Sequence, residues 1–213
     1  MLFDFETLPA RERYKLLVST IVPRPIAWVV TQDSAGVVNA APYSFFNAFS
    51  DDPAVVAIGC GPRPEGSPKD TLANIKATGQ FVVCLVPGTA LEQMNVTATD
   101  FPPGFDELDE AGLHKLASTR VAPPRIAESP VALECETFQL VPVGHHTIVM
   151  GKVLAMHVKD EAVLDAAKNY IDTPKLELVG RMHGRGWYAR TTDRVDVPRY
   201  TAAEWAAHKA ALG

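Results

Sequence analysis

Two short stretches of the chain carry groups that could bind a flat ligand with an anionic end. The first is Asn39-Ala-Ala-Pro-Tyr-Ser44, where small residues and a proline occupy what should be the middle of a strand. Small side chains let a flat ligand approach the backbone N–H and C=O groups, and Asn39 and Ser44 add side-chain donors. A bulged barrel corner would explain the same residue types, so both interpretations stay open.

The second stretch is Ser67-Pro-Lys-Asp-Thr71, which is typical of a helix start and predicts a helix over residues 68–78. Its serine at the N-cap, proline at the first helical position and acid at the third fit that interpretation, and Gly79 predicts the helix end. Free N–H groups and the positive dipole end, together with Lys69 and the Thr71 hydroxyl, would suit a phosphate. The alternative is that these residues only cap the helix.

Aromatic and histidine side chains are weaker candidates. Trp28 and Tyr43 could stack on a ring, although each is individually more typical of a hydrophobic core. His145 and His146 are neighbours and point to opposite faces of an extended segment, so we predict no metal site there. One of the two could contact a ligand, with a surface histidine as the alternative. Acidic pairs such as Asp106-Glu107 are interpreted as solvated loops.

The surrounding elements indicate a mainly β protein, a β-barrel with inserted helices. β-Prone runs at 26–31 and 37–44 flank a polar stretch that ends in glycine, which predicts a hairpin. Further strands are predicted at 53–60, 80–86, 132–143, 147–158 and 176–179. Helices are predicted at 5–20, 68–78, 89–97, 162–170 and 201–212. Segment 98–124 is acidic and proline-bearing, and it predicts a surface excursion with a short helix near 107–116. Hairpins with inserted helices favour an antiparallel barrel or sandwich over a doubly wound sheet.

Composition narrows the class of protein. The 213 residues are 47% apolar, which favours a single domain over 1–213 with helical extensions at both ends. A formal net charge of −5 without a basic tract argues against a nucleic-acid surface. Cys60, Cys84 and Cys135 are predicted to be buried, inert thiols. The sequence shows no secretory signal and no apolar run that could span a membrane, so we expect a soluble cytoplasmic protein.

Five short motifs follow one another along the chain in a specific order and spacing. They are Arg24-Pro-Ile-Ala-Trp28, Asn39-Ala-Ala-Pro-Tyr-Ser-Phe-Phe-Asn47, Asp52-Pro53, Lys69-Asp-Thr71 with Asn74, and His146 followed by Thr-Ile-Val-Met-Gly151. Together they closely resemble the flavin reductase-like family, the flavoredoxin branch of FMN-binding split barrels, over about residues 15–190. The resemblance implies a six-stranded antiparallel Greek-key split barrel that forms a homodimer with FMN in a groove at the dimer interface.

The resemblance also implies which residues contact FMN. Residues along the isoalloxazine and ribityl chain would be Asn39, Ala40, Ala41, Pro42, Tyr43 and Ser44. Lys69, Asp70 and Thr71 would surround the phosphate together with Ser44. Trp28 or His146 would bound the nicotinamide face, and His146 is the predicted catalytic residue.

The implied activity is hydride transfer from NADH or NADPH to bound FMN, then electron transfer to a small-molecule acceptor or a partner oxygenase. Because the flavin supplies the redox chemistry, the protein must hold the ring and place donors near N1 and C2=O. A flavoredoxin-like electron carrier without an NAD(P)H site is one alternative. A barrel that binds haem through His146 or His183 is another. Two departures from the family pattern are segment 98–124 and Arg181-Met-His-Gly-Arg-Gly, whose basic residues could meet a second substrate.

Overall fold

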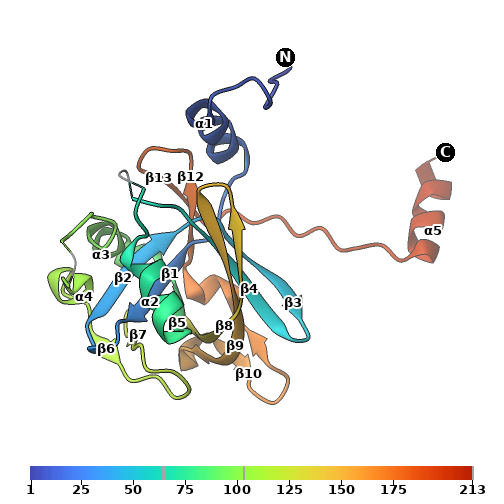
Figure 1. The fold of residues 1–213 in the computed structure, drawn as a ribbon. Coiled ribbons are helices and arrows are strands. Elements are labelled where there is room, and N and C mark those ends of the chain that lie inside the picture. The colour runs from blue at the N-terminus through green and yellow to red at the C-terminus, as the bar shows by residue number, and fades with distance from the viewer. Residues whose placement is uncertain (64–65, 103, 213) are drawn as a thin grey trace.

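The largest element of the fold is a seven-stranded antiparallel sheet with the order β2-β1-β5-β8-β9-β4-β3 (Figure 1). A computed structural model describes residues 1–63, 66–102 and 104–212. The strands of the sheet are β1 Ala27–Gln32, β2 Val38–Tyr43, β3 Phe46–Asp51, β4 Ala54–Cys60, β5 Gln80–Leu85, β8 Val131–Val143 and β9 His146–Val158. The predicted mainly β class with inserted helices is therefore confirmed, and the described sheet has seven strands where six were expected.

Short elements complete the fold. Three two-stranded pairs are β6 Lys115–Leu116 with β7 Arg125–Ile126, β10 Val163–Asp165 with β11 Tyr170–Ile171, and β12 Val179–Met182 with β13 Trp187–Arg190. The helices are α1 Ala10–Thr20, α2 Asp70–Thr78, α3 Leu91–Val96, α4 Glu107–Glu110 and α5 Ala202–Leu212, with 3₁₀ turns η1 Gly88–Ala90, η2 Asp160–Ala162 and η3 Thr173–Leu176. Helices α2, α3 and α4 gather near the β1–β2 end of the sheet, whereas α5 stands away from the body (Figure 1).

The opening hairpin forms as predicted. Asp33 Oδ1 accepts the N–H groups of Ala35 and Val37 at 2.8 Å each, and Gly36 takes a left-handed φ of +91° that glycine adopts without strain. The second strand ends at Tyr43, and the chain then turns into β3, which the sequence did not predict. Most of β3 is exposed, so it lacks the alternation of apolar residues that marks a half-buried strand.

Two predictions in the C-terminal third are wrong. The helix expected at 162–170 is instead η2 followed by the β10–β11 pair. There the Asp165 side chain accepts the N–H groups of Ala167 and Lys168, a local hydrogen-bond pattern that competes with a helix, and Asn169 has a φ of +57°. The strand expected at 176–179 begins only at Val179, because Leu176 ends η3 and Leu178 makes only an isolated β-bridge, with Pro87.

The helix boundaries follow local signals with some shifts. Helix α1 begins at Ala10 rather than at residue 5, and α2 begins at Asp70 with Lys69 at its N-cap, so Ser67 is not the cap. The predicted stop at Gly79 is confirmed, because its φ is +72° and its N–H donates to the Ile75 carbonyl at 2.9 Å. The predicted cap of α5 is also confirmed, since the N–H of Glu204 donates to Thr201 Oγ1 at 3.3 Å.

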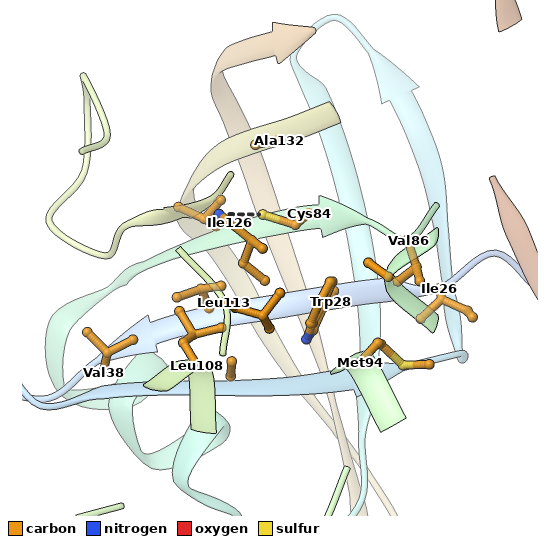
Figure 2. Close-up of a cluster of buried hydrophobic side chains, with 14 of the residues drawn as sticks. Ile26, Trp28, Val38, Cys84, Val86, Met94, Leu108, Leu113, Ile126 and Ala132 are labelled. Atoms are coloured by element: carbon orange, nitrogen blue, oxygen red, sulfur yellow. Dashed lines mark hydrogen bonds between the residues drawn. The ribbon is translucent and has the colours of Figure 1, made fainter. Parts of the chain in front are cut away.

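The core consists of two clusters of buried side chains. Figure 2 shows the first cluster, in which Trp28 of β1 packs near Met94 of α3 and Leu108 of α4. The second cluster centres on Ile58 and Phe81. The Phe81 ring packs directly against Gly151, and any side chain at position 151 would collide with it. All three cysteines are buried thiols, and burial raises the pKa of each to about 12, as their predicted inertness requires. Among the described residues, no helix has the length and apolar character needed to cross a membrane.

Candidate functional site

Two adjoining hollows run along β2, at one edge of the sheet. The first encloses about 500 Å³, open solvent included, and is lined by Asn39, Ala41, Pro42, Tyr43, Arg63, Lys69, Asp70, Thr71, Thr97, Ala98, Thr99, Asp100, Phe101 and Glu107. The second encloses about 470 Å³ and is lined by Ile26, Pro42, Tyr43, Ser44, Met94, Asn95, Ala98, Arg181 and Tyr188. Because Pro42, Tyr43 and Ala98 line both, the two hollows form one groove.

The free backbone edge of β2 explains the proline that looked out of place in the sequence. The N–H of Ala40 donates to Glu107 Oε2 at 2.9 Å and therefore points away from β1. Alternate residues of a strand direct their backbone groups to opposite sides, so the position of Pro42 also faces away from β1. A proline there removes no hydrogen bond from the sheet. The groove is thus bordered by strand backbone that the sheet does not use.

Glu107 is a buried carboxylate at the wall of the first hollow. Helix α4 positions it, because the preceding Asp106 side chain caps the helix by accepting the N–H groups of Leu108 and Asp109. Only 7% of Glu107 is exposed, so its interpretation as part of a solvated loop is wrong. Burial raises the pKa of Glu107 and the nearby acids Asp70 and Asp106 raise it further, against the opposing hydrogen bond from Ala40.

Asn39 joins the strand edge to the start of α2. With its amide oriented to satisfy both neighbours, Asn39 donates to Glu107 Oε1 at 3.3 Å and accepts from Thr71 Oγ1 at 3.0 Å. Thr71 is almost fully buried. These bonds connect β2, α2 and α4, so the three elements that line the first hollow are held in register by side chains that face it.

Tyr43 contributes an unsatisfied polar atom. Its hydroxyl is buried and has no hydrogen-bond partner among the described residues. Burial raises the pKa of Tyr43, so the hydroxyl keeps its proton and can donate it. A buried donor without a partner is unfavourable, and a ligand that offers an acceptor there would remove the penalty.

The cations of the first hollow are paired with acids. Arg63 contacts Asp70 at 2.8 Å, and Lys69 contacts Asp100 at 3.4 Å. The second pair is weak, because the side chains of Lys69 and Asp100 are 37% and 60% exposed and solvent screens them. Lys69 can therefore exchange Asp100 for another anion at small free-energy cost.

The structure brings most of the predicted site residues together. Asn39, Ala41, Pro42, Tyr43, Lys69, Asp70 and Thr71 line the first hollow, and Ala40 directs its N–H to the Glu107 wall of it. Ser44 lines the second hollow instead, away from the lining that contains Lys69.

Trp28 and His146 lie outside both linings. Trp28 is fully buried in the core (Figure 2). Its indole N–H donates to Thr97 Oγ1 at 2.9 Å, and Thr97 in turn lines the first hollow. His146 is exposed at the start of β9, beside Gly61, where an added Cβ would lie 3.1 Å from its Nε2. Its predicted catalytic role stays a prediction.

Sequence reasoning missed the residues that the excursion and its neighbours bring to the groove: Arg63, Thr97, Asp100, Phe101 and Glu107. The available signal was the acidic character of segment 98–124, which resembles that of a solvated loop. Glu107 meets Ala40 across 67 residues of chain, a separation over which local patterns carry no information.

Comparison with known proteins agrees with this architecture. A family model described as "Flavin reductase like domain" matches residues 18–173. An uncharacterized protein of Deinococcus radiodurans is 46% identical over 207 residues, covering 95% of this chain and 91% of its own length. Such relatives extend the likeness to nearly the whole chain.

Solved structures share the fold. Nitrilotriacetate monooxygenase component B from Bacillus cereus superposes with a TM-score of 0.87 and 27% identity, over 92% of this chain and 98% of that one. The 2-nitrobenzoate 2-nitroreductase NbaA from Pseudomonas fluorescens superposes with a TM-score of 0.86 and 32% identity, over 95% of this chain and 98% of that one. A putative flavin reductase with split barrel domain from Shewanella frigidimarina superposes with a TM-score of 0.79 and 21% identity, over 94% of this chain and 100% of that one. At this identity the likeness shows a shared fold and no more.

Proposed function

This chain belongs to the flavin reductase-like family, and we propose that it is an FMN-dependent oxidoreductase that transfers hydride from NADH or NADPH to bound FMN. Flavin-related oxidoreduction is the activity class to which its family and its neighbours point. The observation that carries the proposal is the groove along the free edge of β2, which joins unused strand backbone to the cationic start of α2. That arrangement suits a flat heterocycle with a phosphate on a flexible chain.

The residues present fit FMN. The backbone carbonyls of Ala40 and Pro42 face away from β1 and can accept hydrogen bonds from the polar edge of the ring, whereas the Ala40 N–H is held by Glu107. The small side chain of Ala41 allows a close approach. The Tyr43 hydroxyl is a buried donor that needs an acceptor. Lys69 at the N-cap of α2, with the N–H groups of the first helical turn, would hold the phosphate once Lys69 leaves Asp100.

FMN, when bound, supplies the redox chemistry by accepting a hydride equivalent from a nicotinamide. The protein's part is to hold the ring, exclude water and stabilise charge where it develops. The apolar core beneath β2 supports the groove from one side, and α4 with segment 97–101 covers it from the other. Glu107 accepts the Ala40 N–H, so a ligand that accepts the same N–H must displace the Glu107 carboxylate. Whether Glu107 is protonated or ionised also sets the negative charge of the first hollow.

We infer that the electrons then pass to a small-molecule acceptor or to a partner oxygenase. Among the similar structures, one is a component of a monooxygenase and another is a nitroreductase. The open second hollow gives such a molecule access to the same groove.

Two measurements test the proposal. The purified chain is titrated with FMN and followed by quenching of flavin fluorescence, and the loaded protein is then mixed anaerobically with NADH or NADPH. We expect saturable FMN binding and bleaching of the flavin band by at least one nucleotide. Binding without bleaching by either nucleotide would favour an electron carrier without an NAD(P)H site. A chain that takes up no FMN would overturn the proposal as a whole.

His146 remains our candidate catalytic residue. We expect His146→Ala to lower the rate of flavin reduction while FMN affinity stays the same, because the side chain lies outside both hollow linings. His145→Ala is the matched control, since His145 precedes it in the same hairpin. Equal reduction rates in both variants would remove His146 from the mechanism.

We also propose that the chain works as a homodimer. Large apolar side chains are exposed on α1, β3 and the segment around α5, among them Leu17, Phe49 and Trp205. Aromatic side chains such as Phe49 and Trp205 are enriched at protein–protein interfaces, so their exposure supports a dimer. Light scattering after gel filtration measures the mass directly, and a single 23.1 kDa species at working concentration would contradict a dimer.

The thiol state of the cysteines fits a reducing compartment. All three are free and buried, and we propose a cytoplasmic location on that basis. Fractionation of cells that express the tagged chain, with cytoplasmic and periplasmic marker enzymes followed in parallel, would test it.

A further inference from the structure

Arg181 lines the second hollow without an acidic partner. Its backbone is fixed, because its N–H donates to the Arg24 carbonyl at 2.7 Å and its carbonyl accepts the Arg24 N–H at 3.0 Å. Its guanidinium carbon lies 4.6 Å from the centre of the Tyr188 ring, which faces it across the β12–β13 pair. Among the described residues, none forms an ion pair or a side-chain hydrogen bond with Arg181. The protein therefore fixes the position of the Arg181 guanidinium, but no side chain in the described part of the chain accepts its N–H groups.

Arg24, the other arginine at this end of the groove, is used fully by the fold. It is buried, and its guanidinium donates to the carbonyls of Val18 at 2.7 Å and Ile21 at 3.0 Å, at the C-terminal end of α1. Cations at that end of a helix are favourable. Burial lowers the pKa of Arg24, and the nearby charge of Arg181 lowers it further. Two close guanidinium groups without a carboxylate make this end of the groove strongly positive.

Ser44 supplies a second donor. The Nε of Arg24 donates to Ser44 Oγ at 3.3 Å, so the serine oxygen acts as the acceptor in that contact. The hydroxyl proton of Ser44 is then free to point elsewhere, and Ser44 lines the second hollow. One free guanidinium and one free hydroxyl thus border the same hollow.

Apart from Asn95, the rest of the lining is apolar or aromatic. The walls of the hollow are largely apolar, with contributions from Ile26, Pro42, Met94 and the ring of Tyr188. An apolar wall with a few convergent polar groups is typical of a site for a small organic molecule. The first hollow differs, because its cations are already paired with acids and Glu107 adds a further carboxylate.

We propose that the second hollow binds the carboxylate of a small planar acid, with Arg181 as the specificity-determining residue and the Ser44 hydroxyl as the second donor. The planar guanidinium fork matches a carboxylate in a bidentate way, and the apolar walls match a flat organic body. That such an acid is the second substrate rests on the proposed function. Its binding does not, because Arg181 is not among the residues proposed to hold FMN.

Binding is tested with benzoate as the probe and benzamide as its neutral counterpart, by calorimetric titration of the full chain. We expect benzoate to bind at least about ten times more tightly than benzamide, since the charged hydrogen bonds contribute only for benzoate. Arg181→Gln is expected to weaken benzoate binding by roughly 10- to 100-fold and to leave benzamide binding unchanged. Arg185→Gln is the matched control, because Arg185 lies in the turn of the same hairpin and outside the hollow lining.

Several results would overturn the inference. Equal benzoate affinity in the wild-type chain and Arg181→Gln would show that this arginine recognises no carboxylate. Inorganic phosphate that displaces benzoate more strongly than acetate does would reassign the subsite to a phosphoryl group. Arg181→Lys, which retains the charge over Tyr188 but not the fork, guards against a folding artefact and should bind benzoate with intermediate affinity.

Failure of this inference and failure of the proposed function give different results. Benzoate binding that depends on Arg181 in a chain that takes up no FMN would leave the subsite intact and refute the flavin function. FMN that binds and is reduced normally in a chain without affinity for benzoate would refute the subsite alone.

Discussion

Two buried glutamates show how the molecule separates structure from function. Glu134 lies in the first half of β8 with no exposed surface. Its carboxylate accepts the N–H groups of Thr119 and Arg120 at 2.9 and 2.5 Å and contacts His157 Nε2 at 2.6 Å. Glu107 is nearly as buried, but its contacts are one N–H from Ala40 and the Asn39 amide. The first carboxylate is saturated with donors, and the second is not.

Their pKa values differ accordingly. Burial by itself would raise the pKa of Glu134, but the hydrogen bonds from Thr119, Arg120 and His157 outweigh it and lower the pKa to about 2. For Glu107, burial and neighbouring acids prevail and the pKa is raised. We conclude that Glu134 fastens segment 98–124 to the sheet, while Glu107, on the same segment, adds a negative charge to the first hollow that few donors balance.

Removal of the two carboxylates should affect stability very differently. Glu134→Ala leaves several buried donors without a partner, so we expect it to lower the free energy of unfolding by roughly 3 kcal/mol. Glu107→Ala removes fewer contacts and should cost about 1 kcal/mol. Urea unfolding followed by circular dichroism measures both. Equal losses would show that the two sites do not differ in the way proposed.

Acid should reveal the same contrast. The pKa of Glu134 is about 2 in the folded chain and about 4.3 in an unfolded chain, so its stabilising contribution is complete above pH 4.3 and is lost as the pH falls toward 2. The difference in unfolding free energy between wild type and Glu134→Gln should therefore shrink over that interval. Glu107→Gln should show no such loss, because a raised pKa reverses the sign of the linkage. Urea titrations at a series of pH values provide the measurement.

Lys69, which lines the first hollow together with Glu107, should matter for ligand binding and contribute little to stability. Lys69→Ala is expected to weaken FMN binding by roughly tenfold or more, since a charge-assisted hydrogen bond to the phosphate is lost. Stability should hardly change, because the Lys69–Asp100 pair is exposed. Lys76→Ala, an exposed lysine of the same helix, is the control for a general charge effect. FMN affinity that is the same in both variants would mean that the start of α2 is only a cap.

The smallest expected effect concerns Glu107 itself. Glu107→Gln keeps an oxygen for the Ala40 N–H but removes a negative charge from the first hollow, so FMN should bind a few-fold more tightly. Glu110→Gln changes the same charge on the exposed side of α4 and should have no effect. Fluorescence titration resolves a change of this size. Weaker binding in Glu107→Gln would indicate that the carboxylate contacts the ligand directly.

Features with a local cause were predictable from the sequence. The Asp33–Gly36 turn, the stop at Gly79 and the cap at Thr201 depend on the backbone geometry of a few adjacent residues, and all three were confirmed. Most motif residues of β2 and α2 line one hollow, and their contact with FMN stays a prediction. Their residue types are constrained locally, by the need for small side chains along an edge and for a cation at a helix start.

Tertiary structure alone decided the rest of the groove. Glu107 reaches Ala40 across 67 residues, and Trp28 reaches Thr97 across 69, so no local pattern could show that the acid is buried or that the indole is withdrawn into the core. The exposed strand β3 lacked any apolar alternation to reveal it. The separation of Ser44 and Arg181 from Lys69 likewise depends on how the β12–β13 pair packs against the edge of the sheet. The chain therefore encoded its turns and helix ends locally, whereas the charge balance of the site arose only when distant segments met.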